Sequence, residues 1–594
     1  MRNYLKLLVG IFLFSALIIE GLGIGSGGNV SYYLILILPF FLFLPSMLAK
    51  NGGKTKFPQK FTMLWLIFII FSLISTVFSL NLQNSFGDML FYLATFLIFI
   101  FVYNNKELLK GVILRIVFGV AVIFSLLSMF AGSIAQRTTL LFIPVDLKTN
   151  FFQFVYTAWS HNHLGDFLLL PISALIYWVF VKKFNPAYLF LLIFFIPYFL
   201  FAYSRSAYLD LIVAILFILY YLLKRNYRFK KNLLLVLASA SMIALLSLFI
   251  LAVPSDNSKQ GLLKSINYSL QKKFDLGEKF LLANRNIYFS QGLYSIAQNP
   301  FFGIGPGNFI YASEKYAVTP TEYSITGHNI FFDVFVENGL LAGIMFLALF
   351  LLVFNSLRTQ LFGNNRETFA KENMVLLLFF LVIFLNFQTD FTYLIHSFYL
   401  LFIMLLGLLY REDTNFDLNL APPVLSLFLF LTFNILALSN FALAAGNYVL
   451  AVQVYPFNKN AYEFLINSKL NTDKTGALKY LNQYTSFFSG DSTVLSYGGD
   501  VFYLTGDDGK ALQYYDKSFA QLKFPPIEFV SNVYQLTLNL KGENSAKKFA
   551  DEYFQRFPKV NNTNIAYQNA YYPYRLSVLG FCRKIYHGSC PYVF

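Results

Sequence analysis

Runs of apolar residues long enough to cross a membrane fill the sequence up to residue 445. A helix needs roughly 20 apolar residues to span a bilayer core of about 30 Å, and charged residues or Gly, Pro and Asn separate runs of that length. No A-x-A cleavage site follows the first run, so we interpret it as a membrane anchor. The pattern predicts about 13 transmembrane helices, at 5–24, 31–49, 61–80, 86–103, 112–135, 164–181, 186–203, 207–223, 233–253, 330–356, 374–391, 394–410 and 421–445.

The composition excludes the two main alternatives to a membrane protein. Of the 594 residues, 57% are hydrophobic and 13% are charged, whereas soluble domains have roughly 25% charged residues. The 72 Phe and 40 Tyr also exclude a disordered chain, because disordered segments are poor in aromatic residues. The net charge of +15 must be located before it is taken to indicate a nucleic-acid partner.

Lysine and arginine alternate from one interhelical loop to the next, and this alternation predicts the orientation in the membrane. Loops that carry several cations are cytoplasmic by the positive-inside rule, and so is the N-terminus. An odd number of spans places the C-terminus outside, together with three long stretches at 136–163, 254–329 and from 446 onward. Without a soluble basic domain we expect no nucleic-acid partner. The cytoplasmic cations are Lys50, Lys54, Lys56, Lys60, Lys106, Lys110, Lys182, Lys183, Lys224, Arg225, Arg228, Lys230, Lys231, Arg358, Arg366, Lys371 and Arg411.

The segment from residue 446 to 594 is more polar and repeats with a period near 34. TGALKYLNQY at 475–484 returns as GKALQYYDKS at 509–518 and, more loosely, as NSAKKFADEYF at 544–554. This spacing of small, aromatic and Pro positions resembles tetratricopeptide repeats, in which paired helices stack into an interaction module. A generic bundle of helical hairpins is the alternative. The exterior location permits a disulfide between Cys582 and Cys590, with two free thiols as the alternative.

Two arginines lie outside, where the positive-inside rule does not require them. Arg205 lies in a turn between two apolar runs, flanked by Ser204 and Ser206, and an arginine that reaches lipid headgroups is the alternative reading. Arg285 opens a segment with helical spacing of apolar residues, as expected for a helix on the membrane surface. Arginine pairs bind a diphosphate and can neutralise it as a leaving group.

Two further polar motifs surround the ends of predicted spans. His328 and Asn329 mark the entry of a membrane helix, where the helix dipole disfavours an imidazolium, so we expect a neutral His328 able to act as a general base. An interfacial histidine is the alternative. Asn329, Asp333 and Glu337 share one helix face and predict a polar lining. The other motif, at the opposite long exterior loop, comprises His161, Asn162, His163 and Asp166.

No metal site is predicted from the second motif, because it offers no third nearby ligand and the chain supplies no suitable Cys. Asn162, His163 and Asp166 are interpreted as polar groups where a loop re-enters a helix beside a substrate cavity. A third motif, NPFFGIGPGNF at 299–309, contains Gly303, Gly305 and Gly307. It predicts a tight turn with positive φ rather than a dinucleotide loop, because no strand precedes it.

The location of these motifs also limits the substrate. Nucleotide sugars are not supplied at the exterior face of a membrane, so the diphosphate donor that we expect there is a polyprenyl-linked glycan.

These motifs together resemble the O-antigen ligase and polymerase family of membrane glycosyltransferases over roughly 1–415. The resemblance rests on the order of these motifs along the chain and on the side of the membrane predicted for them, as well as on their residues. Its motifs are YSRSAYL at 203–209, Arg285, PFFGIGPGNF at 300–309, His328 with Asn329, ENGLLAG at 337–343, and WSHNHLGDFLLLP at 159–171.

The resemblance implies an inverting, metal-independent transferase that needs no cofactor and acts in polysaccharide or lipopolysaccharide biosynthesis in the bacterial inner membrane. Its donor would be a glycan on a polyprenyl diphosphate such as undecaprenyl diphosphate, and its acceptor a hydroxyl of a lipid, glycan or protein. Arg205 and Arg285 would hold the diphosphate, and His328 would activate the acceptor or assist the leaving group. The implied substrate-binding residues are Asn162, His163, Ser204, Gly303, Gly305, Asn329 and Glu337.

The predicted architecture is all-α with three parts. A glycosyltransferase domain covers 1–415 with a large exterior loop at 254–329, an additional transmembrane helix covers 416–445, and an exterior repeat domain for a protein partner covers 446–594. The family usually ends after twelve spans, so the additional helix exports the repeats. One competing function is a lipid-linked glycan transporter or flippase, whose intramembrane polar sites would be Asp88, Asp166, Asp210 and Asp390. The other is a non-catalytic scaffold. We find no internal repeat of the kind that transporters show.

Overall fold

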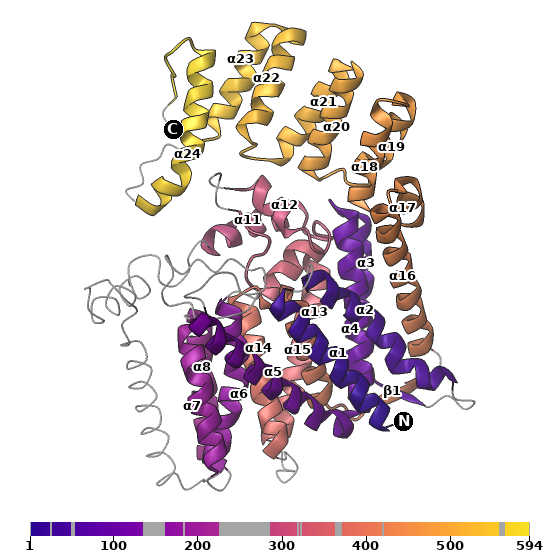
Figure 1. The fold of residues 1–594 in the computed structure, drawn as a ribbon, viewed down its shortest axis with the longest axis vertical. Coiled ribbons are helices and arrows are strands. Elements are labelled where there is room, and N and C mark those ends of the chain that lie inside the picture. Colours follow the sequence, from indigo (N-terminus) through magenta and orange to yellow (C-terminus); the bar gives the residue numbers. More distant parts are fainter. Residues whose placement is uncertain are drawn as a thin grey trace.

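A computed structural model shows an almost entirely helical protein (Figure 1). It describes residues 2–23, 27–48, 54–134, 161–181, 185–202, 204–224, 285–317, 320, 323–362, 371–418, 421–557 and 565–592. Within these residues the only sheet has two strands, β1 (Thr55–Pro58) and β2 (Asn415–Leu418), paired antiparallel with Thr55 opposite Leu418. The all-α fold class is confirmed.

Twelve of the predicted apolar runs coincide with helices, and the run at 233–253 lies outside the described residues. Eight helices are long and apolar enough to cross a membrane: α1 (Arg2–Leu22), α3 (Gln59–Val77), α4 (Leu82–Asn104), α5 (Lys106–Ile134), α6 (His161–Val181), α8 (Arg205–Lys224), α13 (Ile330–Phe362) and α16 (Ala421–Ala444). Four apolar helices have shorter apolar stretches: α2 (Gly27–Leu48), α7 (Pro186–Phe201), α14 (Lys371–Thr389) and α15 (His396–Leu409).

The bundle places apolar side chains both inside and outside, as a bilayer requires. Every residue of α15 from Ser397 to Leu409 is buried, so this helix lies in the centre of the bundle. By contrast, one face of α8 exposes Leu209, Ile212 and Leu216. Large apolar residues exposed along a helix in this way would face lipid rather than water. The protein is therefore a polytopic membrane protein.

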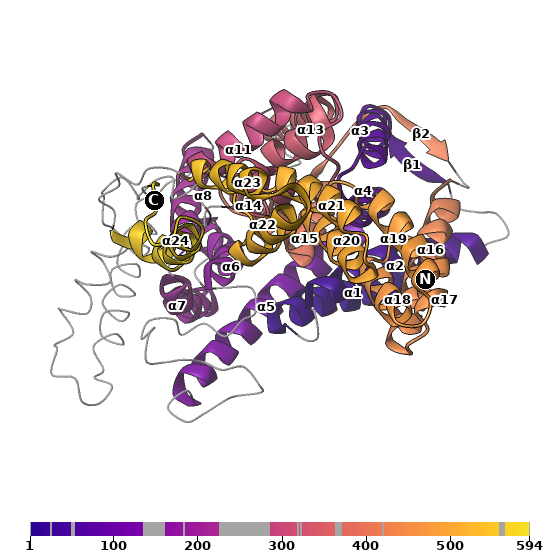
Figure 2. The ribbon, with the colours of Figure 1, turned by 90° about the horizontal axis from the view of Figure 1, so that it is seen from above.

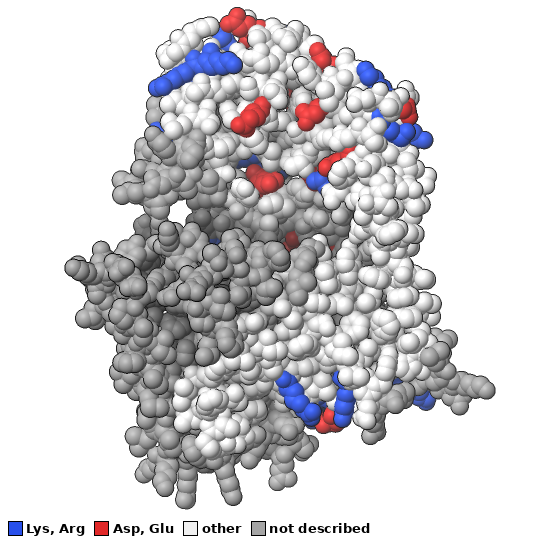
Figure 3. Space-filling view, in the orientation of Figure 1, with Lys and Arg blue, Asp and Glu red and all other residues white. Residues whose placement is uncertain are grey.

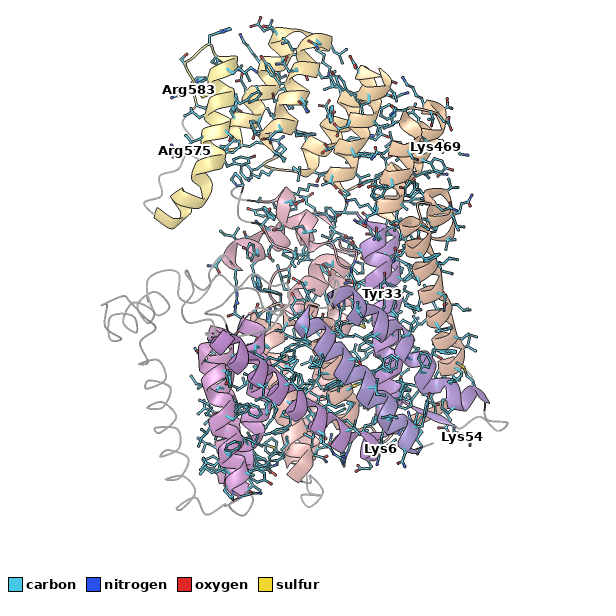
Figure 4. All side chains as sticks on the ribbon, viewed as in Figure 1. Lys6, Tyr33, Lys54, Lys469, Arg575 and Arg583 are labelled. Atoms are coloured by element: carbon cyan, nitrogen blue, oxygen red, sulfur yellow. A yellow bond between two sulfur atoms is a disulfide. The ribbon has the colours of Figure 1, made fainter. Side chains whose placement is uncertain are left out.

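The two ends of the bundle differ, and we name them by their positions in Figure 1. Lys6 and Lys54 lie at the lower end, whereas Lys469, Arg575 and Arg583 lie on the C-terminal helices beyond the upper end (Figure 4). On the face in Figure 3 the charged residues gather at these two levels, and the band between is almost uncharged. Lys54 belongs to the set predicted to be cytoplasmic, so this separation supports the predicted topology, which stays a prediction.

The upper end carries two short helices, α11 (Arg285–Gln298) and α12 (Phe309–Lys315), and above them a curved row of helices that crosses the molecule from α16 toward α8 (Figures 1 and 2). Ala477, Ala511 and Ala546 are buried between helices of this row, and a disulfide joins Cys582 to Cys590. The resemblance to tetratricopeptide repeats stays a prediction. The row comprises α17 (Tyr448–Val454), α18 (Lys459–Leu470), α19 (Lys474–Phe487), α20 (Ser492–Thr505), α21 (Asp508–Gln521), α22 (Ile527–Lys541), α23 (Glu543–Gln555) and α24 (Ile565–Ile585).

Candidate functional site

The glycine turn after α11 packs against a break in α13. Gly339 interrupts the helical backbone of α13 with φ 81° and ψ 173°, and this frees the carbonyl of Glu337 to accept hydrogen bonds from the backbone N–H of Gly305 (2.8 Å) and Ile304 (3.1 Å). A Cβ on Gly303 would lie 2.3 Å from the Glu337 carbonyl oxygen, and Gly303 has φ 66°. Only glycine allows both this backbone angle and this close approach. The turn is therefore the shaping element that its sequence predicts.

The other side of the turn rests on the ends of α3 and α4. The amide of Asn308 donates to the hydroxyls of Ser79 (2.7 Å) and Ser85 (2.9 Å), and Ser85 also donates to the carbonyl of Pro306 (2.8 Å). The carboxylate of Glu337 accepts from the backbone N–H of Phe309 at 3.0 Å, at the start of α12. Glu337 thus supports the turn, and a contact between its side chain and a substrate stays a prediction.

His328 is held in an unusual backbone conformation where α13 begins. Its φ is 60°, in the left-handed region that non-glycine residues seldom occupy outside turns and functional sites. Asp333 fixes the preceding residues, because its carboxylate accepts from the hydroxyl of Thr326 and from the backbone N–H of Gly327. Asn329 accepts from the N–H of Phe332 at 3.0 Å and so caps the helix. The polar face predicted for Asn329, Asp333 and Glu337 therefore mainly orders the loops on either side of His328.

The imidazole of His328 lies beside a carboxylate. Its Nδ1 is 3.5 Å from Oδ1 of Asp390, which follows the end of α14. The ring stacks on Tyr288 of α11 (centroids 5.7 Å apart) and meets the edge of Phe391 (5.3 Å). With 17% of the side chain exposed, His328 is accessible while its ring plane is fixed.

Charge favours the pairing of these two residues. The Asp390 carboxylate also accepts a hydrogen bond from the backbone N–H of Phe391 (2.8 Å), and His163 lies close to it. These partners favour the ionised form of the Asp390 side chain. Such an anion orients the imidazole through one nitrogen and stabilises the positive charge that forms when the other nitrogen accepts a proton.

A second polar cluster joins the first residues of α6 to the start of α8. His163 Nδ1 lies 3.4 Å from Oδ2 of Asp166, and the hydroxyl of Ser204 donates to Oδ1 of the same residue at 3.1 Å. Ser204 also accepts from the N–H of Ala207 and so caps α8. His163 and Asp166 are each only 2% exposed. The edge contact of His163 with Phe391 connects this cluster to His328.

The ligand-type atoms of His163, Asp166 and Asp390 all lie within 4.8 Å of one another. These residue types can bind a metal ion, yet His163 and Ser204 already contact Asp166, and Asp390 faces His328. This geometry is also that of a hydrogen-bonded proton network. The expectation of a metal-independent reaction stays a prediction.

Both candidate arginines begin helices at this end of the bundle. Arg205 is the first residue of α8, directly after Ser204, and its side chain lies outside the described residues. Arg285 is the first residue of α11 and is half-buried, with no hydrogen bond or ion pair to the described part of the chain. Tyr288, one turn further along α11, stacks on His328. The fold therefore brings the helix of Arg285 to the histidine.

The structure thus gathers most of the predicted site residues at one end of the bundle. His163, Ser204, Asn329 and His328 lie around Asp390 and Phe391, while Gly303, Gly305 and Glu337 form the neighbouring support. Asn162 is half-buried in the first turn of α6. From the sequence, Asp390 was predicted only as one of the intramembrane polar sites that a transporter would use. A carboxylate at the end of the predicted span 374–391 was the signal that could have drawn attention to it.

Comparison with known proteins identifies the family of this region. Residues 170–347 match the family model described as O-antigen ligase. The matched segment contains Arg205, Arg285, the glycine turn, His328 and the break at Gly339. No curated protein matches the chain. Residues 170–347 therefore resemble the O-antigen ligase family, and this similarity supports a function in glycan transfer at a membrane.

Proposed function

We propose that the protein transfers a glycan from a polyprenyl diphosphate-linked donor to an acceptor hydroxyl at the extracytoplasmic face of a bacterial inner membrane. The observation that carries the proposal is the accessible His328 imidazole, backed by the Asp390 carboxylate at 3.5 Å, at the end of the bundle where Arg285 and Arg205 begin their helices. A base and two cations at one end of an apolar bundle suit a substrate with a lipid tail and an anionic diphosphate.

The proposed reaction is a single displacement. Nε2 of His328 accepts the proton of the acceptor hydroxyl, whose oxygen attacks the anomeric carbon of the donor sugar. The bond between that carbon and the diphosphate oxygen breaks, and its electron pair leaves with the lipid diphosphate. Arg285 and Arg205 bind the diphosphate and stabilise its growing negative charge. Attack opposite the leaving group inverts the anomeric carbon, and the proton from His328 returns to solvent.

Asp390 acts through His328 in this scheme. Its carboxylate faces Nδ1 of the ring, so Nε2 is the nitrogen left to face the acceptor. The stacked Tyr288 fixes the ring plane, and because Tyr288 and Arg285 share α11, one helix sets the position of both the base and the diphosphate clamp. This coupling supports a role for α11 in aligning donor and acceptor.

The break in α13 also bears on the transporter alternative. Transporters use broken helices whose free carbonyls coordinate ions or substrate at mid-membrane. Here the Glu337 carbonyl at the break accepts from Gly305, Ile304 and the hydroxyl of Ser75 (2.9 Å). Its hydrogen-bonding capacity is therefore used within the protein. Because protein donors already occupy this carbonyl, the break in α13 is better suited to supporting an enzyme site than to coordinating a transported ion.

Mass spectrometry of envelope glycolipids and glycoproteins tests the proposal. Cells that lack the gene would be complemented with the wild type, Arg205→Ala, Arg285→Ala or His328→Ala. We expect only the wild type to restore the glycosylated product, with equal protein abundance in all strains. Arg583→Ala in α24 and His587→Ala in the turn after it, both at exposed positions, are matched controls and should restore it fully. Restoration by all three site variants would reject this site, and the product mass names the acceptor.

A further inference from the structure

The C-terminal helices are fastened to the upper end of the bundle through one buried carboxylate. Asp491 is 1% exposed and caps α20. Its Oδ2 accepts from the hydroxyl of Tyr311 in α12 (2.7 Å) and from Nζ of Lys459 (2.9 Å). Burial raises the pKa of Asp491, but Lys459 and the hydrogen bonds outweigh it and hold this pKa below its usual value. The ionised, buried carboxylate thus accepts from a hydroxyl, from an ammonium group and from backbone N–H groups at the start of α20, and this set of donors makes the contact specific.

The segments on both sides of this contact also touch the membrane domain. Gly490 lies against Leu80, where a Cβ on Gly490 would meet a Leu80 side-chain carbon at 2.5 Å. Lys523, just after α21, approaches the carbonyl of Glu314 in α12 with its backbone N–H at 3.4 Å. The ends of α19 and α21 are thus placed directly over the loops of the membrane domain.

Those loops lead to the proposed site. Ser79 in the loop after α3 and Ser85 at the start of α4 hold the glycine turn. α12 in turn holds α11, because the hydroxyl of Ser313 donates to the side-chain oxygen of Gln291 at 2.6 Å. α11 carries Arg285 and stacks Tyr288 on His328. The C-terminal helices therefore rest on the elements that position the base and the diphosphate clamp.

An open pocket of about 470 Å³ lies between α19, α20 and α21, beside these contacts. Ser489, next to Gly490, and Gln521, two residues before Lys523, line its rim. The pocket therefore borders the docked side of the C-terminal helices. Its other polar lining residues include Asn482, Ser486, Tyr514 and Lys517.

The lining has the chemistry of a saccharide site. A pyranose presents hydroxyls at its edge and C–H groups on its faces, so it needs amide and hydroxyl partners next to an apolar surface. Asn482, Gln521 and Ser486 supply the polar partners. The Tyr514 ring is placed by contacts with Thr485 (3.3 Å between oxygens) and with Nζ of Lys517 (5.1 Å from the ring centre). None of the described residues that line the pocket is a carboxylate, which disfavours a basic peptide.

We propose that this pocket binds an oligosaccharide of the transfer reaction. The ligand chemistry is a neutral or acidic glycan, which the donor or the acceptor would supply, and Lys517 favours an acidic sugar. The inference rests on the proposed transfer for its biological role. The binding of saccharide in this pocket is a separate physical claim that is tested separately.

The binding test uses the full-length protein in lipid nanodiscs and saturation-transfer NMR. One probe is the oligosaccharide released by mild acid from the lipid-linked donor of the source cells, and the other is the purified acceptor glycan. Asn482→Ala with Lys517→Ala removes two polar partners, so we expect about tenfold weaker binding of one probe. The control, Lys479→Ala with Gln513→Ala, changes two exposed residues outside the pocket and should bind as the wild type does.

The probe whose binding weakens identifies the source of the glycan. The proposal would be overturned if the pocket variant bound both probes as tightly as the wild type does. It would also be overturned if the wild type bound neither probe at millimolar concentration, or bound a peptide in their place. A transfer assay separates this inference from the proposed function. The pocket variant should raise KM for one substrate with kcat unchanged, whereas His328→Ala should abolish kcat.

If the wild type transferred no glycan, the proposed function would be rejected, but the saccharide-binding result could still be interpreted by itself. Normal transfer by the wild type, with unchanged KM and binding in the pocket variant, would reject the pocket alone.

Discussion

A single methyl group at Gly303 tests how the glycine turn supports the site. Alanine there would take a φ of 66° and place its Cβ 2.3 Å from the carbonyl oxygen of Glu337, well inside the 3.4 Å at which ordinary contact begins. The backbone must therefore shift, and the obvious movement separates the turn from the break in α13. That shift would also lengthen the hydrogen bonds from Ile304 and Gly305 to the same carbonyl.

The magnitude follows from these two effects. A left-handed backbone disfavours alanine by about 1–2 kcal/mol, and two weakened buried hydrogen bonds contribute about 1 kcal/mol each. We therefore expect Gly303→Ala to lower the free energy of unfolding by about 3–4 kcal/mol. Gly339→Ala should behave alike, because its φ is 81° and its Cβ would lie 2.2 Å from the carbonyl oxygen of Phe301.

Thermal unfolding of the detergent-solubilised protein, measured together with glycan transfer, provides the assay. Both variants should unfold at a lower temperature and lose at least tenfold in transfer. Gly119→Ala in α5 is the matched control, because apart from its own helical backbone and chain neighbours no atom of the described residues lies within 4 Å of the added Cβ, and alanine favours a helix. Wild-type unfolding and transfer in Gly303→Ala would refute the packing of the turn against α13.

Three further changes give distinct outcomes. Asp390→Asn should lower kcat about 10- to 100-fold with little change in donor KM, because the base loses its orienting anion; a normal kcat measured in nanodiscs would contradict this role. Because the pKa of Asp491 is lowered in the fold, its contribution to stability is present above the usual Asp pKa of about 3.9 and is lost below it. Proteolysis should therefore release the C-terminal helices more readily below pH 4, and Asp491→Asn should release them at pH 7. Cys582→Ser should lower the stability of the C-terminal helices by about 2–3 kcal/mol from lost loop closure, as seen in their unfolding temperature without reductant.

Much of the membrane fold could be predicted because the bilayer imposes a requirement that is visible along the sequence itself. Each span needs a run of apolar residues, whatever it packs against. The interruption at Gly339 could not be predicted this way, because the polar Glu337 and Asn338 before it do not end the apolar run, which continues to residue 356. It depends on the docked glycine turn, some 35 residues earlier in the chain, and hydropathy carries no information about such a contact.

The candidate site shows the same division between local and tertiary signals. The His328 loop and the turn at Gly303 have local sequence signatures. The pairing of His328 with Asp390 requires α13 and the end of α14 to meet, and the docking of Asp491 on Tyr311 joins segments 180 residues apart. Neither contact leaves a spacing pattern, so the polar residues were visible in the sequence while their partners were not.

The most direct test of the central claim is glycan transfer by the purified protein. The protein would be reconstituted in nanodiscs with a polyprenyl diphosphate-linked glycan and its acceptor, and products would be followed by mass spectrometry and by NMR of the new anomeric centre. The account predicts an inverted linkage formed by the wild type, no product from His328→Ala, and greatly weakened donor binding in Arg285→Ala. Transfer at the wild-type rate by both variants would contradict it.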